Sequence, residues 1–124
     1  MIILSVDDSA AVRHFIRNAA EVLGYGFLDA ENGKAALDVL KIHSKDVSLI
    51  LLDWNMPVLN GLDLLKTLKA DPVLKDIPVV MVTSEVEKSK MISAIEAGAK
   101  NYITKPFTQE QIMQKILDSL GIGF

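Results

Sequence analysis

The chain alternates five times between a short, continuous apolar run and a stretch in which apolar residues recur at helical spacing. The apolar runs are the predicted strands and cover residues 2–6, 27–30, 47–52, 78–83 and 101–104. The predicted helices lie over residues 12–23, 37–40, 62–68 and 91–95, and after residue 108. Continuous apolar strands are typical of a parallel sheet with helices on both faces. The sequence therefore predicts an α/β fold, a doubly wound, five-stranded parallel sheet.

Turn and capping residues mark where predicted helices begin and end. Gly24 is expected to end the first helix, because glycine tolerates the left-handed conformation common at helix ends. Thr108 and Gln111 have the spacing of a capping box, which predicts that the last helix begins after Thr108. Phe107 precedes this box and is placed to pack on Ile112.

Length and composition fit one soluble globular domain over residues 1–124, and we expect no attached output domain. No apolar run approaches the ~18 residues that cross a bilayer, and the chain opens on a strand-like segment instead of a basic leader. The absence of cysteine excludes disulfides and thiolate metal sites. A net charge of −3 without a basic stripe disfavours nucleic-acid binding. We expect a cytoplasmic monomer.

Polar side chains stand at the carboxyl ends of four predicted strands, where parallel α/β sheets bind their ligands. They are Asp7 and Asp8, Asp53, Thr83 and Ser84, and Thr104 and Lys105. Crowded carboxylates raise one another's pKa values, and a hard cation such as Mg²⁺ relieves this repulsion through oxygen ligands. Mn²⁺ could take the place of Mg²⁺. Together with a lysine and a hydroxyl, these are the groups that a phosphoryl-transfer site needs.

Each of these residues also has a simpler interpretation when taken alone. Asp8 or Ser9 could cap the first helix, and Asp53 could be an exposed loop carboxylate. Lys105 could be a solvated lysine, and Thr83 an ordinary strand residue. The functional interpretation is favoured because four different strands deliver compatible chemistry to one edge of the sheet.

Three other kinds of site use residues of these types. A calcium loop beginning at Asp53 would need glycine where the chain has Val58. A phosphatase with an aspartate nucleophile would be expected to carry Asp-x-Asp after the first strand, where this chain has Asp7-Asp8-Ser9. A flavin mononucleotide site stays open on the fold alone, although two aspartates at this place would repel its phosphate.

Four motifs follow one another in a fixed order: "VDDS" (6–9), "DWNMPVLNG" (53–61), "VTSE" (82–85) and "GAKNYITKPF" (98–107). In this order and spacing they resemble the receiver domain of two-component response regulators, over essentially the whole chain. The resemblance is greatest to single-domain chemotaxis regulators. It implies a flavodoxin-like fold with strand order 2-1-3-4-5.

The resemblance implies that Asp53 is the phosphoacceptor, which receives a phosphoryl group from a histidine kinase of the chemotaxis type. Asp8 and Asp53 would ligate Mg²⁺ together with the backbone carbonyl of Asn55, and Asp7 would act through water. Asn55 and Glu85 would tune the lifetime of the phosphorylated state.

The resemblance also implies a switch. Thr83 would hydrogen-bond the phosphoryl oxygens, Lys105 would pair with them, and the Lys105–Pro106 peptide bond would be cis. Phosphorylation would draw Thr83 inward and let Tyr102 rotate into the space that it leaves. The surface of the fourth helix, fifth strand and fifth helix would change as a result.

Lys88 and Lys115 match positions that chemotaxis regulators use at this output surface. Ser84 and Thr104 depart from the residues usual there, which bears on the identity of the partner. The implied function is a phosphorylation-controlled binding module, not an enzyme for an external substrate, whose partner is a flagellar motor switch protein. The alternative is a phosphorelay intermediate or phosphate sink that exchanges the group with a histidine phosphotransfer protein. A phosphatase could act on either.

Overall fold

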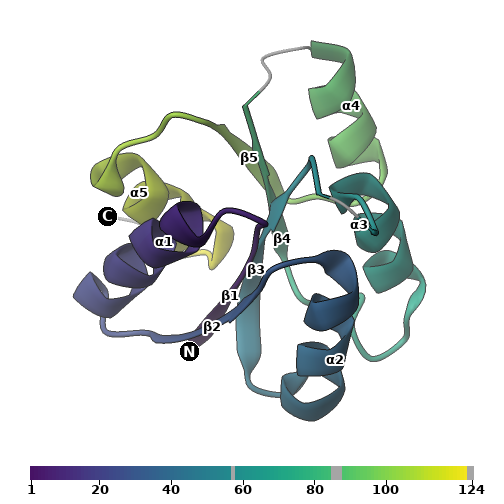
Figure 1. The fold of residues 1–124 in the computed structure, drawn as a ribbon, viewed down its shortest axis with the longest axis horizontal. Coiled ribbons are helices and arrows are strands. Elements are labelled where there is room, and N and C mark those ends of the chain that lie inside the picture. Colours follow the sequence, from purple (N-terminus) through teal and green to yellow (C-terminus); the bar gives the residue numbers. More distant parts are fainter. Residues whose placement is uncertain (57, 85–87, 123–124) are drawn as a thin grey trace.

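The computed structural model describes residues 1–56, 58–84 and 88–122 of the chain. Its centre is a parallel sheet of five strands in the order β2-β1-β3-β4-β5 (Figure 1). The strands are β1 Ile2–Val6, β2 Gly26–Ala30, β3 Val47–Asp53, β4 Val79–Thr83 and β5 Asn101–Thr104. The helices are α1 Ala10–Val22, α2 Gly33–His43, α3 Gly61–Ala70, α4 Lys88–Glu96 and α5 Gln109–Ser119. The predicted fold class and strand order are confirmed, and each predicted strand end lies within one residue of the observed one.

The helices cover the sheet in two layers, with α1 and α5 on one face and α2, α3 and α4 on the other (Figure 1). Side chains of β3 alternate between the two hydrophobic clusters that result. Leu49 and Leu51 pack toward α1 and α5, whereas Ile50 and Leu52 pack toward the opposite layer. All four are at most 1% exposed, which explains why four consecutive positions of this strand are apolar.

Side-chain caps hold the starts of four helices. The capping residues are Ser9, Asn32, Asn60 and Thr108, each of which accepts a hydrogen bond from a backbone N–H three residues later. The predicted capping box of Thr108 and Gln111 is confirmed, and Gly24 follows α1 with a φ of 79°. Among the described helices, none is long and apolar enough to cross a membrane.

The register of the sheet brings the carboxyl ends of its central strands to one edge. Asp53 of β3 pairs with Val82 of β4, and Thr83 of β4 pairs with Thr104 of β5. Asp7 follows directly after β1, which lies beside β3. The polar residues at the strand ends therefore meet above the middle of the sheet.

Candidate functional site

Asp53, the last residue of β3, is almost wholly buried, with 4% of its surface exposed. Backbone hydrogen bonds fix the chain that follows it. The N–H of Trp54 donates to the carbonyl of Val82 at 2.9 Å, and the N–H of Gly61 donates to the carbonyl of Trp54 at 2.9 Å. The loop after β3 therefore closes back on the strand end and leaves the Asp53 carboxylate at the edge of the sheet.

Gly61, the first residue of α3, is a position where this loop leaves no room for a side chain. A Cβ atom on Gly61 would overlap the carbonyl oxygen of Asp53 and lie 2.8 Å from the Cα of Trp54. Within the loop, Val58 has a φ of 73°, which is strained for a β-branched residue, and it is 80% exposed. Strain of this kind is often found beside functional sites.

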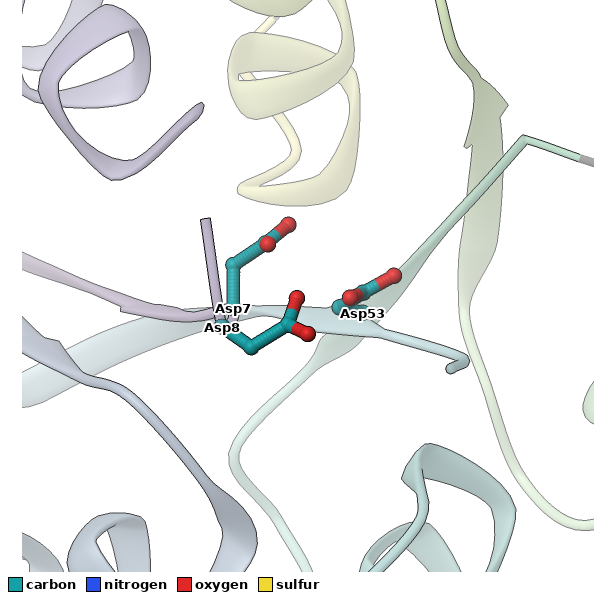
Figure 2. Close-up of side chains that lie close together, drawn as sticks. All are labelled: Asp7, Asp8 and Asp53. Carbon is teal, nitrogen blue, oxygen red and sulfur yellow. The ribbon is translucent and has the colours of Figure 1, made fainter. Parts of the chain in front are cut away.

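Asp7 and Asp8 lie beside Asp53, and oxygens of the three carboxylates are all within 4.8 Å of one another (Figure 2). Asp7 is buried and Asp8 is exposed. One carboxylate oxygen of Asp7 accepts a hydrogen bond from the N–H of Ser9 at 2.8 Å. Ser9 caps α1 by accepting a hydrogen bond from Val12 N–H. Of the two capping candidates, Ser9 is therefore the cap, and the Asp8 carboxylate faces the other two acids instead.

Lys105 brings a positive charge from the end of β5 into this acidic group. Its Nζ lies 3.0 Å from Oδ2 of Asp7 and 3.5 Å from Oδ1 of Asp53, and its side chain is 23% exposed. The backbone N–H of Lys105 donates to the carbonyl of Thr83 at 2.6 Å. The Lys105–Pro106 peptide bond is cis, the geometry that the sequence resemblance implies.

Burial is the main reason why the pKa of Asp53 is raised from its ordinary value of 3.8 to about 6. The charge of Asp7 raises this pKa further and that of Asp8 adds a smaller increase, whereas Lys105 and a hydrogen bond from the backbone of Asn55 lower it. At pH 7 the carboxyl is still mostly ionised, because the pH then lies about one unit above the pKa. The site thus holds an ionised carboxylate in surroundings that disfavour its charge.

The three carboxylates fit a hard divalent cation. They offer oxygen ligands, and one of these, Oδ2 of Asp7, is buried and has no partner but the Lys105 ammonium among the described residues. Three ionised carboxylates and one lysine leave the group with an excess of negative charge. Because Asp8 is exposed, a cation there would keep access to water, as Mg²⁺ commonly does.

Thr83 is the last residue of β4 and lies at the same edge of the sheet, where it pairs with Thr104 of β5. The Thr83 side chain is buried, since only 4% of the residue is exposed. Tyr102 lies two residues earlier on β5, and the Nζ of Lys115 stands 5.6 Å from the centroid of its ring. Lys115 also donates a hydrogen bond to Oδ1 of Asn101 at 3.2 Å. Tyr102 and Lys115 thus form one surface of β5 and α5.

The remaining predicted positions differ in what can be said of them. Asn55 is exposed and lies in the loop after Asp53, where its backbone approaches the carboxylate. Ser84 is exposed just after β4. Glu85 and the side chain of Lys88 lie outside the described residues.

Sequence inspection missed Arg13. Its Nη1 donates a hydrogen bond to the carbonyl oxygen of Asp7 at 2.7 Å, and its Nε donates to Oδ2 of Asp29 at 2.9 Å. The sequence places Arg13 in the first turn of a predicted helix, and nothing there distinguishes it from a solvated arginine such as Arg17. Only the tertiary structure shows that it reaches back to the loop after β1.

Comparisons with known proteins point to one family. The sequence model of the response regulator receiver domain matches residues 3–117. A chemotaxis protein CheY homolog of Campylobacter jejuni is 44% identical over 124 residues, which cover 99% of this chain and 95% of the relative. Chemotaxis protein CheY1 of Helicobacter pylori is 43% identical over 122 residues, which cover 98% of each chain.

Solved structures agree with this result. The chemotaxis response regulator CheY4 of Vibrio cholerae superposes with a TM-score of 0.88 at 27% identity, over 95% of this chain and 97% of that one. A response regulator from Chloroflexus aurantiacus, described as putative, has the same TM-score and identity over 97% of both chains. The regions matched in these comparisons include the strand ends at which Asp7, Asp8 and Asp53 lie.

Proposed function

This chain belongs to the family of response regulator receiver domains and is CheY-like, and on that premise we propose that Asp53 accepts a phosphoryl group from a histidine kinase. Receiver domains of this type are regulators and not classical enzymes. The observation that carries the proposal is the placement of Lys105, within 3.0 Å of Asp7 and 3.5 Å of Asp53, inside a group of three carboxylates. Such a site can hold a cation and a phosphoryl group at once.

Asp53 acts as the nucleophile. One of its carboxylate oxygens forms a bond to phosphorus while the P–N bond to the donor's imidazole breaks, and the electron pair of that bond stays on the imidazole nitrogen. Asp8, Asp53 and the backbone carbonyl of Asn55 would hold Mg²⁺, which would supply positive charge to neutralise the phosphoryl oxygens. Asp7 orients a water molecule beside these ligands. Lys105 pairs with a phosphoryl oxygen and compensates the charge that the transferred group brings.

Thr83 and Tyr102 link this chemistry to the surface. The Thr83 hydroxyl donates a hydrogen bond to the phosphoryl group and moves toward it, and Tyr102 turns into the space that becomes available. The new charge thus biases the protein between two packings of the edge formed by β4 and β5. Asn55 and Glu85, which follow Asp53 and Thr83 by two residues in the sequence, tune how long the phosphoryl group persists.

The output surface lies over α4, β5 and α5. An open apolar groove of about 350 Å³ runs between α4 and β5, lined by Met91, Ile92, Ile95, Glu96 and Tyr102. Ile92 is 47% exposed and Ile95 is 48% exposed, which is the kind of apolar surface that partners bind. Lys115, whose Nζ lies 5.6 Å from the ring centroid of Tyr102, adds positive charge beside this groove, and Lys88 is the first residue of α4. A flagellar motor switch protein is the proposed partner, in keeping with the names of the chemotaxis relatives.

The phosphoacceptor is tested with acetyl phosphate and Mg²⁺, followed by intact-protein mass spectrometry. The starting protein should take up one phosphoryl group, and Asp53→Asn should take up none. Asp38→Asn is the matched control, because Asp38 is an exposed acid on α2, away from the strand ends. Stoichiometric labelling of Asp53→Asn at another residue would refute the assignment.

The output is tested by binding of a peptide from a flagellar switch protein, with and without Mg²⁺ and beryllofluoride as a phosphoryl mimic. Binding should tighten by about tenfold or more, which corresponds to about 1.4 kcal/mol of coupling. Lys105→Ala should leave Mg²⁺ binding in place but remove this gain. Phosphorylation of Asp53 without peptide binding in either state, followed by transfer to a histidine phosphotransfer protein, would instead identify a relay intermediate or phosphate sink.

A further inference from the structure

The guanidinium of Arg13 joins three separate parts of the fold. From the first turn of α1 it donates one hydrogen bond to the carbonyl oxygen of Asp7 at 2.7 Å and another to the carboxylate of Asp29 on β2 at 2.9 Å. The Arg13 side chain is only 17% exposed. Because the guanidinium is planar and carries donors in fixed directions, both bonds restrain it at once. The chain just after β1 is therefore tied to α1 and to β2.

The carbonyl that Arg13 holds belongs to the peptide unit between Asp7 and Asp8. This unit is planar, so a hydrogen bond that fixes its carbonyl also fixes the direction in which the chain enters Asp8. The Asp7 carboxylate has further restraints from Ser9 N–H at 2.8 Å and from Lys105 at 3.0 Å. Among the described residues, none donates a hydrogen bond to the Asp8 carboxylate or pairs with it. The place of that carboxylate therefore depends on the backbone.

We infer that Arg13 is a positioning residue of the cation site: through the Asp7 carbonyl it sets the direction of the Asp8 carboxylate, and so the affinity for Mg²⁺. This inference rests on the proposed function, in which Asp8 is a metal ligand. Arg13 itself touches neither the cation nor the phosphoryl group.

The direction in which the Mg²⁺ affinity changes when Arg13 is removed distinguishes a positioning role from a purely electrostatic one. A guanidinium near a cation site repels the cation, so charge alone predicts that Mg²⁺ binds more tightly when Arg13 is removed. Positioning predicts the opposite, because the Asp8 oxygen then spends less time where it can act as a ligand. Loss of a group that orients a metal ligand typically weakens metal binding by about 10- to 100-fold.

The test is a titration with MgCl₂ of the metal-free protein, followed by the amide NMR shifts of residues 7–9 and 53–55. Arg13→Ala should weaken Mg²⁺ binding about tenfold or more. Arg17→Ala is the matched control, since Arg17 lies one turn further along α1 and pairs at 3.1 Å with Glu21 on the exposed face. It should change the affinity by less than about twofold, as expected for a screened surface charge. Arg13→Lys keeps the charge but loses the forked donor, and its affinity should fall between the two.

Urea unfolding without metal completes the test. If Arg13→Ala lowers the unfolding midpoint while its Mg²⁺ affinity equals or exceeds that of Arg17→Ala, Arg13 has a structural role only and the inference is overturned, although the proposed function stands. No shift of residues 53–55 in the unsubstituted protein would overturn both. If Arg13→Ala does not fold, Arg13→Lys decides: Mg²⁺ binding as tight as in the unsubstituted protein refutes positioning.

Discussion

Replacement of Asp53 with asparagine should stabilise the metal-free protein at neutral pH, and this stabilisation should nearly vanish in acid. Burial, followed by the charge of Asp7, raises the pKa of Asp53 from 3.8 to about 6. Between these two pH values the folded state holds a proton that the unfolded chain releases. Stability from the protonated carboxyl is therefore fully present below about pH 3.8 and is lost as the pH rises through about 6. A neutral amide at this position avoids that loss.

The size of the effect follows from the same pKa values. At 1.36 kcal/mol per pKa unit, the change from 3.8 to about 6 corresponds to about 3 kcal/mol of stability lost above pH 7. An asparagine keeps the shape of Asp53 and an oxygen that can face Lys105, and Lys105 keeps its ion pair with Asp7 at 3.0 Å. We therefore expect Asp53→Asn to raise the free energy of unfolding by about 1–3 kcal/mol at pH 7.5, and by about 0.5 kcal/mol at pH 4.

The assay is urea unfolding with a metal chelator present, followed by circular dichroism at both pH values. Asp38→Asn, which changes an exposed acid, should show no gain that depends on pH. Adding Mg²⁺ should narrow the difference at pH 7.5, because binding stabilises the protein that retains Asp53 more than the variant. A variant that is no more stable than the starting protein at pH 7.5, or that gains equally at both pH values, would refute the argument from burial.

Four further outcomes are expected. The fluorescence of Trp54, the sole tryptophan, should change on titration with Mg²⁺, because Trp54 adjoins Asp53; a flat titration would contradict metal binding there. Gly61→Ala should lower the free energy of unfolding in urea by more than about 2 kcal/mol, since its Cβ would overlap backbone atoms of Asp53. Gly24→Ala, with a φ of 79° but open space around it, should cost only about 1 kcal/mol. Thr108→Ala should cost about 1 kcal/mol through loss of the capping box, and an unchanged urea midpoint would contradict that role.

The strand pattern could be predicted from sequence because β1, β3 and β4 are buried on both faces. Burial of that kind favours continuous runs of apolar residues, and the signal is strong even in one sequence. The edge strand β2 gave a weaker signal, since Phe27 and Leu28 are only partly buried and Gly26 and Asp29 are exposed.

Helical spacing did not predict which apolar side chains of α4 are buried. Ile92 and Ile95 have the spacing of a buried stripe, yet both are about half exposed, and among the side chains of this helix that the structure describes only Ala94 is buried. Periodicity indicates that side chains share a face of a helix, but tertiary packing decides whether that face is covered. The apolar groove of the proposed output surface could therefore not be inferred from spacing.

The meeting of Asp7, Asp53 and Lys105 followed from topology, because parallel strands end at the same edge of a sheet. Two features of the site could not be predicted in this way. The raised pKa of Asp53 depends on the depth of its burial and on its distances to three charged groups. The bond from Arg13 to the Asp7 carbonyl depends on the angle at which α1 leaves the sheet, since a helix of the same sequence tilted elsewhere would leave Arg13 in solvent.

Stability and reactivity in this site are opposed for one physical reason. Burial and the charge of Asp7 disfavour the ionised form of Asp53, and the folded protein is less stable above pH 6 because of it. A bound cation would relieve the same unfavourable charge, so part of the proposed affinity for Mg²⁺ would derive from stability that the metal-free protein lacks. Lys105 relieves only part of it, since its ammonium is shared between Asp7 and Asp53. A substitution that made the empty site more stable, by neutralising Asp7 or Asp53, would therefore weaken cation binding, which is the trade-off expected where function requires buried like charges.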